Sequence, residues 1–179
     1  MTDRQKLTLS LAPGEGEDPE IGRWLRALKD TRSRMNQALQ DLPAELVDRL
    51  PPSGGSSIGA ILYHLAIIEA DWLFDDVLGT QETDWPAELF PMDAREDGEH
   101  LSPFADETVD QHLARLKKIR TMLVETISSM SADELHRPRE RKDYDVSPAW
   151  VLHHLMQHEA EHRSQIGSVR EALGAGVGW

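Results

Sequence analysis

Long segments in which apolar residues recur every three or four positions alternate with shorter segments rich in proline, glycine and acids. Four segments have this helical period, and none alternates apolar and polar residues as a half-buried strand does. The apolar stripes run over residues 19–42, 58–78, 109–130 and 151–173. Four long amphipathic helices without strands predict an all-α fold, a four-helix bundle.

Helix-start and helix-stop residues flank these stripes. A serine stands before the second and the fourth stripe, proline occupies a first turn, and glycine follows the last apolar position. A Ser-x-x-Glu capping box at Ser131 opens a further short turn, and residues 43–50 read as a helical turn before a Pro/Gly loop. The predicted boundary residues are Pro19 for the first helix, Ser56 or Ser57 with Gly79 for the second, and Ser147, Pro148 and Gly174 for the fourth.

The remaining segments divide the chain into one folded unit with two extensions. Residues 1–18 end in a polar, glycine-rich stretch and are expected to form a flexible arm, while residues 19–174 form the bundle and 175–179 a tail. Residues 80–104 lack a steady period, and a long irregular segment of this kind often covers a functional site.

Length and charge narrow the class of protein. A chain of 179 residues with 39% hydrophobic content suits a single domain, and the lack of a long apolar run or a signal segment favours a cytoplasmic protein. The formal charge of −13 repels phosphate backbones and anionic lipids, so neither nucleic acid nor a membrane is expected as a partner. Since the chain has no cysteine, any metal site must use nitrogen and oxygen ligands.

Histidines supply the candidate chemistry. His154, His158 and His162 stand four residues apart among apolar neighbours on the last predicted helix, so their rings share one stripe. His64 stands at a core-facing position of the second helix. A single such histidine is usually a satisfied core residue, but two ligands from one helix and a third from a facing helix build a bundle metal site. Three protein ligands leave positions open for water or substrate, which is typical of a catalytic metal.

Residues 158–162 also spell H-E-x-x-H, the zinc-protease signature. Such proteases usually take their third ligand from further along the chain, yet only 17 residues follow His162 and none is a histidine. There is also no strand pattern along which a peptide substrate could align. Proteolysis is therefore the weaker interpretation.

Two segments resemble the DinB-like superfamily of YfiT-type metalloenzymes. Residues 57–72, with their H-L-x-x-x-E-x-x-W core, resemble its second helix, and the spaced histidines followed by residues 163–171 resemble its fourth. The resemblance covers roughly residues 21–174 and implies an up-down-down-up bundle with the long loop between helices two and three. It also implies a metal held by His64, His158 and His162, and a homodimer.

Characterised relatives in this superfamily include S-transferases that use mycothiol, bacillithiol or glutathione. The resemblance therefore implies a metal-dependent transferase or hydrolase for a small-molecule substrate, with a divalent ion (zinc, nickel or iron) and a low-molecular-weight thiol as cosubstrate. A non-enzymatic metal-binding or dimeric bundle is the alternative. The residue types suggest further pocket or ligand-orienting side chains around the ion: Tyr63, Glu69, Asp71, Trp72, His154 and Glu159. Of these, Glu159 lies about 100° around the helix from His158 and is not expected to be a ligand.

Overall fold

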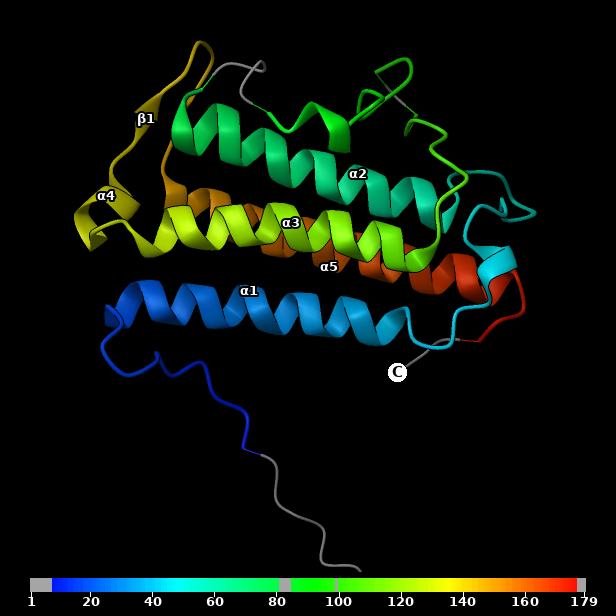
Figure 1. Cartoon of the computed structure of the whole chain (residues 1–179), viewed down its shortest axis with the longest axis horizontal. Helices are drawn as coiled ribbons and strands as arrows, with labels where there is room; N and C mark the ends of the chain where they lie inside the picture. Colours follow the sequence, from blue (N-terminus) through cyan, green and yellow to red (C-terminus); the bar gives the residue numbers. More distant parts are fainter. Residues whose placement is uncertain (1–7, 81–84, 99, 177–179) are drawn as a thin grey trace, which may run out of the picture.

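Four long helices lie side by side in the computed structural model, which describes residues 8–80, 85–98 and 100–176 (Figure 1). They are α1 (Pro19–Ala38), α2 (Ile58–Asp71), α3 (Val109–Ser128) and α5 (Pro148–Ala172). In Figure 1, α2 and α3 run in the same direction, opposite to α1 and α5, so the chain crosses over in the long segment between α2 and α3. The predicted up-down-down-up four-helix bundle is confirmed.

The helix ends follow the predicted chemistry. The Ser57 hydroxyl accepts a hydrogen bond from the Ala60 amide at 3.1 Å, and the Ser147 hydroxyl accepts one from the Trp150 amide at 3.3 Å. Gly79 and Gly174 adopt positive φ angles of 67° and 77°, which glycine tolerates without a steric cost. Of the two candidate serines, Ser57 caps α2.

Short elements fill the connections. A 3₁₀ turn (Ala44–Leu46) falls inside the expected helical turn, a second one spans Ala87–Leu89, and the capping box at Ser131 opens α4 (Ala132–His136). Two strands, β1 (Arg139–Glu140) and β2 (Asp145–Val146), pair antiparallel. The prediction of no strand is wrong here, because a two-residue strand is too short to show any alternation.

The end of the second helix differs from a regular α-helix. Trp72–Leu78 forms a π-helical segment that leads into Gly79. This wider turn buries Leu73, Phe74 and Val77 together with the carboxylate of Asp76, which accepts hydrogen bonds from Tyr144 and Arg141 beside the strand pair. The segment therefore joins α2 to the β1–β2 hairpin.

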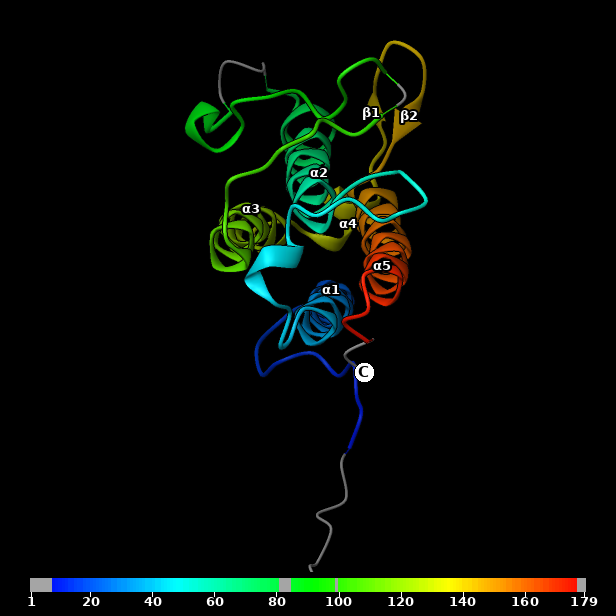
Figure 2. The same cartoon turned by 90° about the vertical axis from the view of Figure 1, so that its right-hand side faces the viewer.

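Almost every residue of α2 is buried. Figure 2, which views the helices end-on, shows α3 and α5 on either side of α2 and the loop before α3 above it. Tyr63 fastens this loop: its ring stacks on Phe104 with centroids 4.1 Å apart, and its hydroxyl accepts from the Met92 amide at 3.0 Å and donates to the Met92 carbonyl. The irregular segment thus covers the helix that carries His64.

The predicted arm and tail are described only in part. Residues 1–7 of the expected arm and 177–179 of the expected tail fall outside the described residues. Ahead of α1, the carboxylate of Glu17 accepts hydrogen bonds from the Gly14 amide and from Arg26, so the end of the expected arm packs against that helix. None of the described helices combines the length and apolarity of a membrane span.

Candidate metal centre

Three histidine rings from two helices meet between α2 and α5. Nε2 of His158 lies 3.3 Å from Nε2 of His64 and 3.1 Å from Nε2 of His162, and one ligand nitrogen from each ring lies within 4.8 Å of the other two. His64 is buried, while His158 and His162 are half-buried. The cluster is therefore closed on the α2 side and open toward the surface on the α5 side.

The Nδ1 atoms point away from the cluster, and their hydrogen bonds determine whether Nε2 of the same ring can act as a metal ligand. Nδ1 of His162 donates to the amide oxygen of Gln165 at 2.8 Å, which leaves its Nε2 with a lone pair facing the cluster. Nδ1 of His64 is buried without a hydrogen bond of ordinary geometry, although the backbone of Ala94 is close enough to raise the pKa of the ring. Such outer partners are the usual supports of metal-bound imidazoles.

The cluster is held in its neutral form. Burial, followed by the neighbouring His162 and Arg95, lowers the pKa of His64 to about 4. Burial and the other imidazoles lower the pKa of His158 to about 3. Burial also lowers the pKa of His162. Neutral imidazole is the form that binds a metal ion.

These nitrogens fit a metal ion better than they fit one another. Nε2 of His158 faces two other Nε2 atoms, and a single N–H can be shared with only one of them. Two imidazole ligands at about 2.0–2.1 Å from a tetrahedral zinc ion lie about 3.3 Å apart, close to both separations observed. The donor set therefore suits a divalent first-row cation.

His154 and Trp72 continue the stripe away from the cluster. The ring of His154 stacks on that of His158, with centroids 5.9 Å apart, and contacts Trp72 at 4.7 Å and Trp150 at 5.2 Å. His154 is therefore a neighbour of the cluster, and no ligand grouping in the described residues includes it. His153, one residue before His154 on α5, is exposed.

Glu69 and Glu159 lie in a second buried cluster, which we call the ion cluster: Arg32, Glu69, Arg120 and Glu159. Arg32 donates to Glu159 at 2.6 Å and to Glu69 at 2.8 Å. Arg120 donates to Glu159 at 2.8 Å and to both oxygens of Glu69. The expectation that Glu69 orients an imidazole is replaced by this placement, because its carboxylate is occupied by two guanidinium groups.

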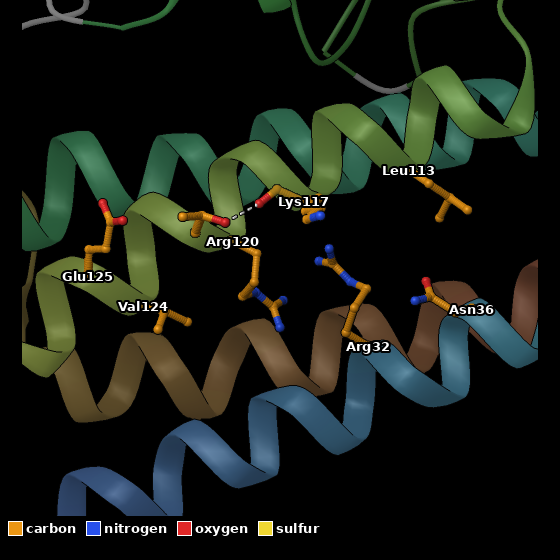
Figure 3. A pocket seen from close by; sticks show the side chains of 8 residues that line it. Arg32, Asn36, Leu113, Lys117, Arg120, Val124 and Glu125 are labelled. Carbon is orange, nitrogen blue, oxygen red and sulfur yellow. Dashed lines mark hydrogen bonds between the residues drawn. The ribbon is translucent and has the colours of Figure 1, made fainter. Parts of the chain in front are cut away.

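The ion cluster ties all four long helices together and borders a groove. Arg32 and Arg120 extend from α1 and α3 toward one another in this groove of about 450 Å³ (Figure 3). Burial alone would raise the pKa of Glu69, but Arg120 and Arg32 outweigh it and hold that pKa below its ordinary value. Burial alone would lower the pKa of Arg120, but the carboxylates of Glu69 and Glu159 outweigh it and raise that pKa. The four members of the cluster are thus paired with one another.

Tyr63 and Asp71 lie elsewhere than at the cluster. Tyr63 is fully buried against the loop, where its hydroxyl bonds Met92, so it is a packing residue rather than a pocket residue. Asp71 lies half-buried at the end of α2, where burial, Asp75 and Asp76 raise its pKa to about 6. Among the described residues, no hydrogen bond or ion pair joins Asp71 to an imidazole.

Sequence reasoning missed the residues that support both clusters. Gln165 stands three residues after His162, a spacing that could have indicated a partner on the same helix face. Arg32 and Arg120 each interrupt an apolar stripe, and a charged residue at a core-facing position signals a buried partner. Arg95 had no such signal, because its loop has no period from which to infer its place.

Fold and site together define a four-helix bundle with an open three-histidine candidate metal centre between α2 and α5. The sequence profile described as the DinB superfamily matches residues 27–166, and the chain belongs to that superfamily. No curated protein matches the sequence significantly.

Two solved structures have the same architecture. YfiT from Bacillus subtilis, described as "a probable metal-dependent hydrolase with an unusual four-helix bundle topology", matches with a TM-score of 0.59 at 16% identity, over 90% of this chain and 93% of YfiT. A protein from Streptococcus pneumoniae matches with a TM-score of 0.62 at 15% identity, over 86% of this chain and 91% of its own. At such identities the likeness establishes the fold.

Proposed function

We propose that this chain is a metal-dependent enzyme in which His64, His158 and His162 hold one divalent cation, with zinc, nickel and iron as the candidates. The observation that carries the proposal is the convergence of three neutral Nε2 atoms, with both His158 separations matching the spacing of ligands on a common ion. The description of YfiT as a probable metal-dependent hydrolase supports the same class of reaction.

The side chains around the site determine which groups of a substrate can bind there. Gln165 holds His162 in one tautomer, and half-exposure of His158 and His162 leaves a path for a small molecule. Arg95 lowers the pKa of all three ligand histidines, so its positive charge reaches the site and favours an anion there. A bound divalent ion would add the ability to lower the pKa of a water or thiol near neutral pH.

The nucleophile in our proposal is a low-molecular-weight thiol, such as mycothiol, bacillithiol or glutathione, with water as the hydrolytic alternative. In S-transfer, a thiolate sulfur would form a bond to an electrophilic carbon of the substrate and the leaving group would depart with the bonding electrons. The chain has no cysteine, so the sulfur must come with the cosubstrate. Family resemblance supports the thiol, and the YfiT description supports water.

A zinc protease is disfavoured by the place of Glu159. In an H-E-x-x-H protease the glutamate activates the water. Here both oxygens of Glu159 accept hydrogen bonds from guanidinium groups of α1 and α3, away from the histidines. The motif therefore results from the spacing of two metal-ligand candidates around one structural carboxylate.

Elemental analysis of untagged protein tests the metal. We expect about one ion per chain in the wild type, none in the H64A/H158A/H162A variant, and the wild-type value in H153A, which removes an exposed histidine of the same helix. Equal, negligible metal in all three would overturn the proposal.

Activity assays then separate the reaction classes. Metal-loaded protein is incubated with each thiol and a reactive electrophile, and separately with ester and amide substrates. Acceleration that needs a thiol supports transfer, and acceleration in water alone supports hydrolysis. A chelator that lowers the melting temperature while no reaction is found in either assay would favour a non-enzymatic metal-binding bundle.

A further inference from the structure

An aromatic pocket lies beside the histidine cluster, where the π-helical segment, the β1–β2 hairpin and the start of α5 meet. It has a volume of about 430 Å³. We call it the aromatic pocket, and its lining side chains include Trp72, Pro138, Tyr144, Val146 and Trp150. The ring of Trp72 lies 5.4 Å from that of Trp150 and 6.3 Å from that of Tyr144. π-helical segments of this kind frequently occur at functional sites.

A row of ring contacts along α5 links the pocket to the histidine cluster. His154 lies between them: its ring is parallel to that of Trp150 within 6° and stacks on that of His158. Trp150 and His158 are eight residues apart on α5, which is a span of about 12 Å along the helix. A molecule of about that length would reach from one place to the other.

The chemistry of the pocket disfavours an anionic group, because the exposed carboxylate of Asp145 belongs to its lining. Several polar side chains of its lining already have partners within the protein: Tyr144 donates to Asp76 at 3.0 Å, His136 bonds Glu20 at 2.5 Å, and the Ser147 hydroxyl accepts from the Trp150 amide. A charged ligand group would not find these groups available. The exposed faces of Trp150 and Tyr144, each about half accessible, instead offer flat apolar surface for another ring.

The histidine end of this row has the opposite preference. At the histidine cluster the ring nitrogens converge where His158 and His162 are half-buried and partly open to solvent. A divalent cation held there would supply a positive charge that three neutral imidazoles do not cancel. An anionic group is therefore favoured at the histidine end, and an uncharged ring at the tryptophan end.

We propose that the aromatic pocket is a substrate subsite, and that the substrate is an amphipathic anion whose charged head group lies at the histidine cluster and whose aromatic group lies against Trp72 and Trp150. This proposal rests on the proposed function for the head group only. The aromatic contact depends on Trp72 and Trp150, which are not metal-ligand candidates.

Calorimetric titration of zinc-loaded protein with phenylhexanoate and with hexanoate tests the subsite. The two probes share the carboxylate and the alkyl chain and differ in the ring. We expect phenylhexanoate to bind about tenfold more tightly, as burial of part of one ring would give. In W150A the ratio of the two affinities should fall toward one, and W150F should keep most of it. L50A, which truncates an exposed leucine outside the pocket lining, should keep all of it.

The outcomes separate the subsite from the metal. A ratio of one in zinc-loaded wild type, or a ratio that W150A leaves unchanged, would overturn the subsite while the metal proposal stands. If the protein takes up no zinc, the metal proposal fails, and a tenfold preference for phenylhexanoate that W150A abolishes would still support the subsite. Trp150 is half-exposed, so the W150A variant is expected to fold, which circular dichroism checks.

Discussion

The histidine cluster and the ion cluster are built on the same two helices and have opposite characters. α2 contributes His64 to one and Glu69 to the other, while α5 contributes the adjacent residues His158 and Glu159. The glutamates are paired with Arg32 and Arg120 from the other two long helices. The histidine nitrogens face one another, and among the described residues no carboxylate is hydrogen-bonded to them. Buried polar groups with full partners are structural, and those without them indicate a ligand.

The two clusters should respond differently to loss of a member. Removing an arginine from the ion cluster leaves a buried charge without compensation. Removing a histidine from the other cluster takes away a buried polar ring whose charged form the fold disfavours, so little stability is lost. Stability should therefore depend on the ion cluster, and metal binding on the histidines.

The largest effect is expected from H158A on metal affinity. His158 is the ring that approaches both of the others, so its loss breaks both close pairs. We expect affinity for zinc to fall by more than the roughly 100-fold that loss of an outer partner can cost. Competitive titration with a chromophoric chelator measures this.

The metal-free H158A protein provides the internal control. Its melting temperature should equal or exceed that of metal-free wild type, because a half-buried imidazole with a lowered pKa has been removed. A variant that keeps its zinc affinity, or that loses it only because the fold melts, would contradict the separation of the two clusters.

R120M should produce the largest loss of stability. It removes the hydrogen bonds that Arg120 donates to Glu69, to Glu159 and to the Leu28 carbonyl. Breaking a buried ion pair by removing one partner costs about 3–5 kcal/mol in free energy of unfolding. Urea denaturation of metal-free protein measures the change.

A surface arginine and a full replacement sharpen this test. R137M removes an exposed ion pair with Glu134 and should change the unfolding free energy by less than about 0.5 kcal/mol. Replacing all four members of the ion cluster by apolar residues should recover much of the loss in R120M. A loss in R120M no greater than that in R137M would show that the ion cluster does not hold the bundle together.

Acid pH should weaken the metal-free fold in two separate windows. Burial lowers the pKa values of His64 and His112 to about 4, below the 6.5 of the unfolded chain. As pH falls below 6.5 the unfolded chain binds protons that the folded chain does not, so stability falls down to about pH 4. Glu69 has a folded pKa below 4.5, so its contribution is present above pH 4.5 and is lost only as pH falls further.

Between pH 6.5 and pH 4.5, the change in stability therefore comes from the histidines and not from Glu69. We expect the unfolding free energy to fall there by roughly 2 kcal/mol per pH unit, because His64, His112 and His158, all with lowered pKa values, together outweigh Asp71, whose raised pKa of about 6 acts in the opposite direction. Denaturation curves at several pH values measure this slope, and H64L should reduce it. A flat profile over this interval would mean that the rings are protonated in the folded state.

Much of this arrangement is visible in the sequence because it is local. The helices follow from the 3.6-residue period and their caps, and the four-residue spacing of His158 and His162 places two rings on one face. The long-range pairs are different, since Arg32 and Glu159 are separated by 127 positions and no local pattern connects them. A signal was nevertheless present: Arg120 stands four residues after Leu116 and three before Leu123, where the stripe demands an apolar residue.

The π-helical segment and the strand pair could not be predicted for a related reason. Both depend on contacts between the end of α2 and the hairpin, in which Tyr144 and Arg141 bind Asp76. The aspartate at position 76 reads as an exposed polar residue in a helical pattern. Asp76 can be buried only because Tyr144 and Arg141 bind its carboxylate. Partners so distant in the sequence produce no periodic pattern from which the contact could be predicted.

The smallest expected effect belongs to the cap of α2. In S57A the Ala60 amide loses its acceptor, at a cost of about 1 kcal/mol in unfolding free energy. Zinc affinity of the folded protein should stay within about threefold of wild type, because the ion cluster still fixes α2 against α5. S147A, which removes the cap of α5, should behave alike. If either variant lost far more zinc affinity than stability, the position of the histidines would depend on the helix ends, and the ion cluster would not be what aligns the two ligand helices.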